Sequence, residues 1–143
     1  MELMPGFNVR TYGVLLSKDL NQVLLVEEMI EGRRLLKFPG GGIELGEGPA
    51  EALKREFKEE LEFSVEVESV FYVSPNFHVS YFRPQQFLGL YWRLRWSDLN
   101  QVPTSQNPNI KAHWKNISAL RPEELTHPLD QEVVRHLLSL KNP

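Results

Sequence analysis

The chain of 143 residues contains no cysteine. Disulfides and thiolate metal sites are therefore excluded, and this composition fits the reducing interior of a cell. The chain also lacks an apolar run of roughly 18 residues, the length that a helix needs to cross a bilayer. Residues 1–10 show neither the basic start nor the apolar centre of a signal peptide. We therefore expect a soluble, cytoplasmic protein with no membrane partner and a single domain over residues 1–143.

Positive charge is not in excess, because 16 Lys and Arg stand against 19 Asp and Glu, which gives a net charge of −3. Without a basic stripe, the chain is a poor candidate for bulk nucleic-acid binding. The negative charge is concentrated in residues 44–62, where seven acidic residues face three basic ones. An acidic helix is usually a solvated surface, so charge alone does not indicate a site.

A helix is predicted over residues 49–61 of the acidic segment. Pro49 stands where the first turn of a helix tolerates proline. Apolar side chains recur every four residues at Leu53, Phe57 and Leu61, which predicts a stripe that packs on a sheet.

Three carboxylates, those of Glu56, Glu59 and Glu60, project from one side of the predicted helix, since each residue turns it by about 100°. Like charges at these spacings destabilise a helix by roughly 0.2 to 0.5 kcal/mol per pair. Hard divalent cations with oxygen ligands relieve such repulsion. The spacing therefore indicates a site for Mg²⁺ or Mn²⁺.

The same segment carries a longer pattern, since residues 41–63 read GGIELGEGPAEALKREFKEELEF. The spacing of Gly41, Glu47 and the REF-K-EE run that begins at Arg55 resembles the Nudix box of the Nudix hydrolase superfamily, the MutT-like nucleoside diphosphate-X hydrolases. Every fixed position of that box is matched except one, where Glu62 replaces the usual glycine. A glycine there fits a left-handed helix cap, and a glutamate in that conformation would cost roughly 1 kcal/mol.

The resemblance implies an α/β fold, the Nudix-type α/β/α sandwich with a mixed β-sheet between helices. The remaining sequence favours the same class. Residues 8–17 and 23–30 are predicted to pair as an antiparallel hairpin, and residues 129–140 to form a second helix. Further strands are predicted at 33–38, 65–73, 87–96 and 112–117, and a long polar loop at 97–111.

The resemblance also implies a reaction, the hydrolysis of a pyrophosphate linkage in a nucleoside diphosphate derivative by water attack at phosphorus. Glu56, Glu59 and Glu60 would be the metal ligands and the catalytic carboxylates, with the backbone at Gly41 completing the metal site. Arg55 belongs to the same catalytic group, where we expect it mainly to tie the preceding loop to the helix through bidentate hydrogen bonds.

The general base is less clear from the sequence. Some relatives use a glutamate of the box and others a glutamate on a distant loop, but the loop at 97–111 contains Asp98 as its only acid. We rank Glu59 first, Asp98 second and Glu132 last. A base carried by a loop would then be missing in this chain.

Candidate substrate contacts lie outside the box. Phe77, His78, Tyr81 and Phe82 could grip a nucleobase by stacking and polar contacts, and Arg10 could meet a phosphate from the first strand. The ordinary alternatives are that aromatic residues pack in the core and that a strand arginine only improves solubility. The aromatic segment 77–96 also favours a homodimer.

Two other functions compete with hydrolysis of an NTP, a nucleotide sugar or a similar small nucleotide. A non-catalytic Nudix-like module that binds a nucleotide or a protein partner would be expected to lose carboxylates of the box, and all three are present. An isomerase of an isoprenoid diphosphate would call for a cysteine, which the chain lacks.

Overall fold

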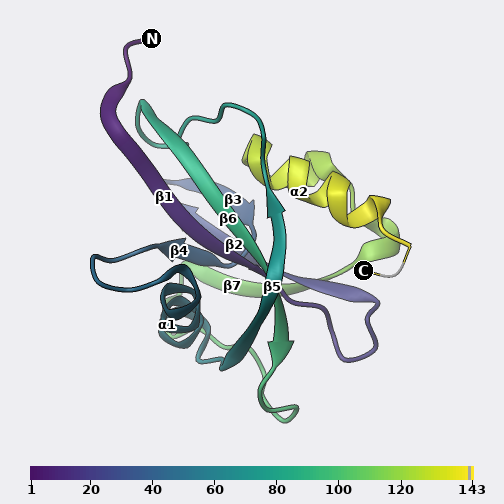
Figure 1. The fold of residues 1–143 in the computed structure, drawn as a ribbon. Helices are drawn as coiled ribbons and strands as arrows, with labels where there is room; N and C mark the ends of the chain where they lie inside the picture. The colour runs from purple at the N-terminus through teal and green to yellow at the C-terminus, as the bar shows by residue number, and fades with distance from the viewer. Residues whose placement is uncertain (142) are drawn as a thin grey trace.

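The strands form two sheets in the computed structural model, which describes residues 1–141 and 143 (Figure 1). The first sheet is mixed and has the order β4-β1-β6-β5, with β1 parallel to β6. The second sheet is antiparallel and has the order β3-β2-β7. The strands are β1 (Met4–Val14), β2 (Gln22–Ile30), β3 (Arg33–Lys37), β4 (Gly40–Gly42), β5 (Val65–Val73), β6 (Gln85–Trp96) and β7 (Ile110–Asn116).

Two α-helices cover opposite faces of the strands, α1 (Pro49–Leu61) and α2 (Pro128–Ser139) (Figure 1). Two short 3-10 helices, Ile117–Ala119 and Pro122–Glu124, precede α2. Strand β2 shows how the layers are built, because its buried side chains alternate between two cores. Val23 and Leu25 pack in the core beneath α2, whereas Leu24 and Val26 pack in the core beneath α1. The α/β/α sandwich is therefore confirmed.

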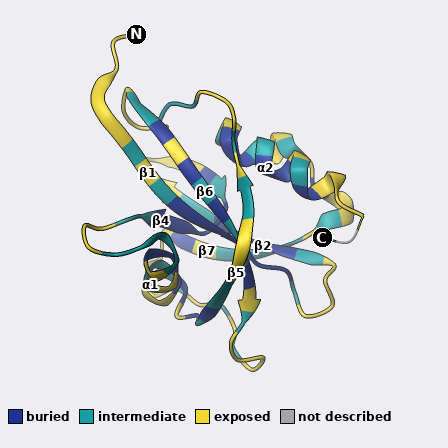
Figure 2. Cartoon of the chain, viewed as in Figure 1, coloured by how far each residue is buried: buried dark blue, intermediate teal, exposed yellow. Residues whose placement is uncertain are grey.

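Burial is greatest where the strands cross between the helices, and the outer end of β1 is exposed (Figure 2). In the part of the chain that the structure describes, no helix combines the length and the apolar character needed to cross a membrane.

The predicted hairpin of residues 8–17 with 23–30 is wrong. Strand β1 pairs with β4 and β6, and β2 pairs with β3 and β7. The two segments meet only where the chain crosses between sheets, through a bridge of Leu16 with Val23 and a 2.9 Å bond from Leu24 N–H to Leu15 O. Local alternation predicts a strand correctly, but its partner is decided by contacts far along the sequence.

The predicted first helix is confirmed, since α1 starts at Pro49 and ends at Leu61. The strand at 65–73 is confirmed too, and the other predicted strands and the second helix are found with shifts of a few residues at their ends.

Glu62 takes the left-handed conformation that suits glycine, with φ 51° and ψ 40°. Its carboxylate accepts a 2.8 Å hydrogen bond from Thr104 Oγ1, and Thr104 N–H donates to Leu61 O at 2.8 Å. These contacts fasten the long loop after β6 to the end of α1 and offset the conformational cost of a glutamate at this position.

Candidate functional site

Arg55 joins helix α1 to the loop that precedes it. Its Nε and Nη2 atoms donate to the two carboxylate oxygens of Glu47, at 3.1 and 2.6 Å, and Nη2 also donates to Gly42 O at 3.1 Å. The hydrogen bonds to Arg55 lower the pKa of Glu47 below its ordinary value. Arg55 thus makes the bidentate contact for which its planar fork of donors is suited.

Glu56 lies between Arg55 and the backbone of β4. Its Oε1 accepts from Arg55 Nη1 at 3.1 Å, and its side chain is only 14% exposed. A Cβ added to Gly41 would fall 2.4 Å from Glu56 Cδ, far inside van der Waals contact. Only glycine therefore leaves room for this carboxylate against the strand, which gives a physical reason for the first residue of the box.

Glu60 stands one turn further along α1, four residues after Glu56. The pKa of Glu60 is raised to about 7, mainly by burial; the charges of Glu56 and Glu28 contribute to the rise, and Lys37 opposes it. A cation bound nearby would therefore stabilise the ionised form of Glu60.

Glu59, the third predicted ligand, is more exposed than Glu56. Its carboxylate accepts from Arg55 Nη1 at 3.3 Å, and its side chain is 59% exposed. Among residues 1–141 and 143, no three acidic or histidine side chains are arranged to hold a metal ion. Glu56 and Glu59 therefore share one donor, Arg55 Nη1, but Glu59 is mostly exposed, whereas Glu56 lies against Gly41 with Glu60 one turn away.

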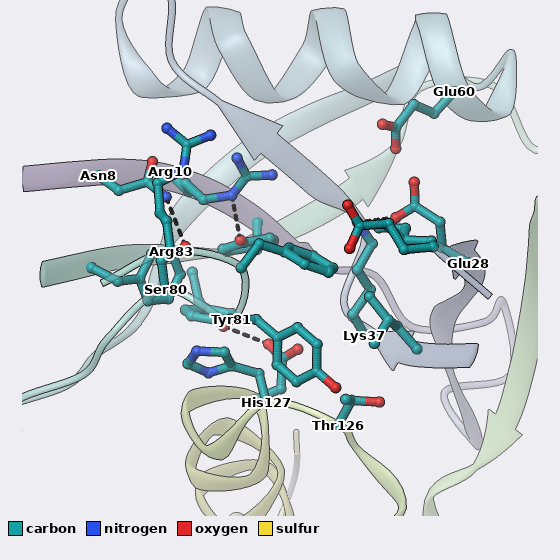
Figure 3. Close-up of a pocket in the computed structure, with 18 residues that line it drawn as sticks. Asn8, Arg10, Glu28, Lys37, Glu60, Ser80, Tyr81, Arg83, Thr126 and His127 are labelled. Carbon is teal, nitrogen blue, oxygen red and sulfur yellow. Dashed lines mark hydrogen bonds and ion pairs between the residues drawn. The ribbon is translucent and has the colours of Figure 1, made fainter. Parts of the chain in front are cut away.

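A cavity of about 430 Å³ opens beside Glu60. Figure 3 shows Arg10 and Arg83 on one side of it and Glu28, Lys37 and Glu60 on the other. Tyr81 also lines this cavity, whereas the predicted substrate contacts Phe77 and His78 do not. Of the five substrate contacts that the sequence suggested, Arg10, Tyr81 and Phe82 therefore lie at the cavity.

Two tyrosines that stack on each other, Tyr12 and Tyr91, line the cavity. The rings of Tyr12 and Tyr91 stack with centroids 5.0 Å apart, and Tyr91 OH donates to Asp130 Oδ1 at 2.5 Å. Burial raises the pKa of Asp130 to about 7. Sequence reasoning missed Asp130 and Lys37; for Asp130 the signal was its spacing to Val133 and Val134, which places it on the buried side of α2.

The remaining candidates for the general base are engaged elsewhere. Asp98 Oδ1 accepts from Asn100 N–H at 2.9 Å, so Asp98 stabilises a turn. Glu132 accepts from Tyr72 OH, Ser74 Oγ and Asn76 Nδ2, and its Oε2 lies 2.9 Å from His78 Nε2. Both lie outside the cavity lining.

We next compared the sequence and the fold with those of known proteins. The NUDIX domain model matches residues 7–137. A search of curated proteins found no match.

Solved structures resemble the chain over nearly its full length. A NUDIX hydrolase from Nitrosomonas europaea is 22% identical with a TM-score of 0.76, over 92% of this chain and 88% of that one. A MutT NUDIX hydrolase from Burkholderia pseudomallei is 17% identical with a TM-score of 0.73, over 92% and 98%. An ADP-ribose pyrophosphatase from Streptococcus suis is 18% identical with a TM-score of 0.60, over 92% and 89%. At these identities the likeness concerns the fold alone, but the NUDIX domain match covers most of the sequence, and the chain therefore belongs to the NUDIX domain family.

Proposed function

We propose that this protein hydrolyses a pyrophosphate linkage in a nucleoside diphosphate derivative, with Mg²⁺ or Mn²⁺ as cofactor. Membership of the NUDIX domain family supports the reaction class. The observation that carries the proposal is the Glu56 carboxylate packed against Gly41, with Glu60 beside it at the rim of a cavity. Pyrophosphate and paired carboxylates repel each other, so a divalent cation between them is the natural third partner.

The residues present fit such a cation. Mg²⁺ typically takes one or two carboxylates and completes its shell with water and phosphate oxygens. Glu56 and Glu60 would supply these carboxylates, and because Gly41 has no side chain, the Glu56 carboxylate can lie directly against the backbone there. When bound, the ion would polarise the phosphoryl oxygens and acidify a water molecule.

The other residues of the box take supporting parts in this proposal. Arg55 holds the loop of Glu47 and Gly42 against α1, which keeps Glu56 at Gly41. Glu59 is an exposed carboxylate of the box and remains our first choice as the acceptor of the proton from the attacking water.

A small nucleotide fits the cavity best. A volume of about 430 Å³ lies within the range usual for small-molecule sites, and Tyr81 offers an aromatic face at its rim. We therefore favour an NTP, a nucleotide sugar or a similar compound. Phe77 and His78 are less suited to touch it than Tyr81, since neither lines the cavity.

A broad panel of nucleotides with Mg²⁺, with products identified by mass, tests the proposal. We expect phosphate, pyrophosphate or a nucleoside monophosphate to be released from at least one compound. Glu60→Gln should reduce kcat on the order of a hundredfold to a thousandfold, because a metal ion contributes several kcal/mol to the transition state. Glu123→Gln, which changes an exposed carboxylate on a 3-10 helix, serves as the matched control.

The competing function is a binding module without catalysis. No turnover of any compound, together with nucleotide binding that Glu60→Gln leaves unchanged, would favour that module over the hydrolase. We further propose a cytoplasmic homodimer that takes small nucleotides rather than bulk nucleic acid. Sedimentation at low micromolar concentration that shows only monomer would remove the dimer from this description.

A further inference from the structure

Arg10 lies on β1 directly opposite the start of the box. It pairs in register with Gly42 of β4, and a Cβ added to Gly42 would stand 3.7 Å from Arg10 Nη1. The side chain is half-buried and lines the cavity. Arg10 therefore places its guanidinium between the box and the cavity (Figure 3).

Tyr12 contacts this guanidinium on the side of its Nε atom. Arg10 Nε donates to Tyr12 OH at 2.7 Å, and the guanidinium carbon stands 5.8 Å from the centroid of the Tyr12 ring. The ring of Tyr12 is itself fixed, because it stacks on buried Tyr91, whose hydroxyl is bonded to buried Asp130. A donor anchored in this way loses less entropy when it binds a ligand.

Within residues 1–141 and 143, the structure gives no partner to the other end of the guanidinium. Neither Nη atom of Arg10 makes a hydrogen bond or an ion pair to another side chain within residues 1–141 and 143. Burial lowers the pKa of Arg10, but Tyr12, Glu56 and Glu60 together raise it above its ordinary value. Arg10 is thus a charged fork that faces the cavity, close to the box carboxylates but not neutralised by a direct contact with them.

We propose that the Nη atoms of Arg10 bind the diphosphate of the substrate from the cavity side, and that Tyr12 is the positioning residue that aims them. A planar guanidinium matches two phosphate oxygens at once, and such charge-assisted pairs are among the stronger hydrogen bonds in proteins. The proposal rests on the proposed function for the class of ligand, but it requires no turnover.

Binding of inorganic pyrophosphate in the presence of Mg²⁺, measured by calorimetry, tests this inference without knowledge of the nucleobase. Arg10→Ala should weaken binding by about tenfold to a hundredfold. Tyr12→Phe keeps the ring but removes the Nε contact, and should weaken binding by about threefold to tenfold. The matched control is Arg95→Ala, which removes one positive charge from an exposed position of β6 and should change binding by less than about twofold.

Chemical rescue separates a contact from a structural role. Millimolar guanidinium should restore pyrophosphate binding to Arg10→Ala and leave Arg95→Ala unchanged, since it can fill the vacated space beside Tyr12. If Arg10→Ala fails to fold, Arg10→Lys decides instead, because lysine keeps the charge but cannot present a fork and should bind about tenfold more weakly.

The outcomes distinguish this inference from the proposed function. Equal effects of Arg10→Ala and Arg95→Ala, or no binding of pyrophosphate by the unaltered protein, would overturn it. Wild-type affinity in Tyr12→Phe would remove the positioning role of Tyr12. Binding that depends on Arg10 in a protein that turns over no compound would support the inference and refute the hydrolase.

Discussion

Two residues act as hubs in this protein, and they are opposite in charge. Arg55 is one cation among the carboxylates of Glu47, Glu56 and Glu59. Glu132 is one carboxylate among donors from Tyr72, Ser74 and Asn76, with the His78 ring beside it. Each hub fastens a loop to a helix, Arg55 before α1 and Glu132 beside α2.

The comparison shows that the two hubs stabilise their surroundings through different kinds of contact. Around Arg55 the partners are charged and some are exposed, so the charges compete and water screens them. Around Glu132 the side chain is only 13% exposed, and its main partners are hydroxyl and amide groups. We infer that replacing the more deeply buried hub lowers the free energy of unfolding by the larger amount.

Glu132→Gln should have the largest effect on stability. Burial raises the pKa of Glu132, but hydrogen bonds from Ser74, Tyr72, Asn76 and His78 lower it from 4.5 to about 2. A shift of this size corresponds to about 3 kcal/mol of unfolding free energy at neutral pH. Urea unfolding at pH 7 should show a loss of this order for Glu132→Gln.

The contribution of Glu132 to stability should fall as the pH is lowered. The carboxylate is favoured in the folded state, so its contribution is fully present above pH 4.5 and is lost as the pH falls toward 2. The difference in stability between the unaltered protein and Glu132→Gln should therefore shrink over this interval. A difference that stays constant from pH 7 to pH 3 would contradict the assigned role, and Glu123→Gln should show no difference at any pH.

Arg55→Lys should have the next largest effect, about 2 kcal/mol, because one ammonium group cannot replace bidentate bonds to Glu47 and a bond to Gly42. The Arg55 side chain is 22% exposed, so the loss should be smaller than that at Glu132. Thermal and urea unfolding measure it, with Arg95→Lys as the control of equal chemistry at an exposed site. Equal stability of the two lysine variants would show that the fork of Arg55 does not hold the loop.

The two hubs also differ in how far the sequence reveals them. Arg55 and Glu47 stand eight positions apart in a pattern that resembles a known box, and the helix between them carries its own local signals at Pro49 and Leu53. Glu132 gathers partners that lie 54 to 60 positions away. No local pattern brings such residues together, which is why Glu132 was considered only as a remote candidate for a base.

The residues of the candidate site differ in the same way, since some are recognised from local spacing and others only from distant contacts. The position of Glu56 follows from the box and from the missing Cβ of Gly41. The contact of Arg10 with Tyr12 and the stacking on Tyr91 require that β1 lie parallel to β6, and the hairpin predicted from local alternation gave β1 a different partner. The local spacing of the box therefore predicts which residues lie around Gly41, whereas the contacts of Arg10 depend on strand partners and so on non-local packing.

Glu62 sharpens the comparison because it is a third attachment of a loop to a helix, and it is exposed. Glu62→Ala keeps the left-handed strain but loses the bond from Thr104, so it should destabilise the protein by about 1 kcal/mol. Glu62→Gly loses the same bond but removes the strain, so its stability should lie within about 0.5 kcal/mol of the unaltered protein. Thr104→Val isolates the bond itself, and its cost should vanish in the Glu62→Gly background. If Glu62→Gly were as unstable as Glu62→Ala in urea unfolding, the strain at this helix end would be negligible and the loop contact alone would account for the residue.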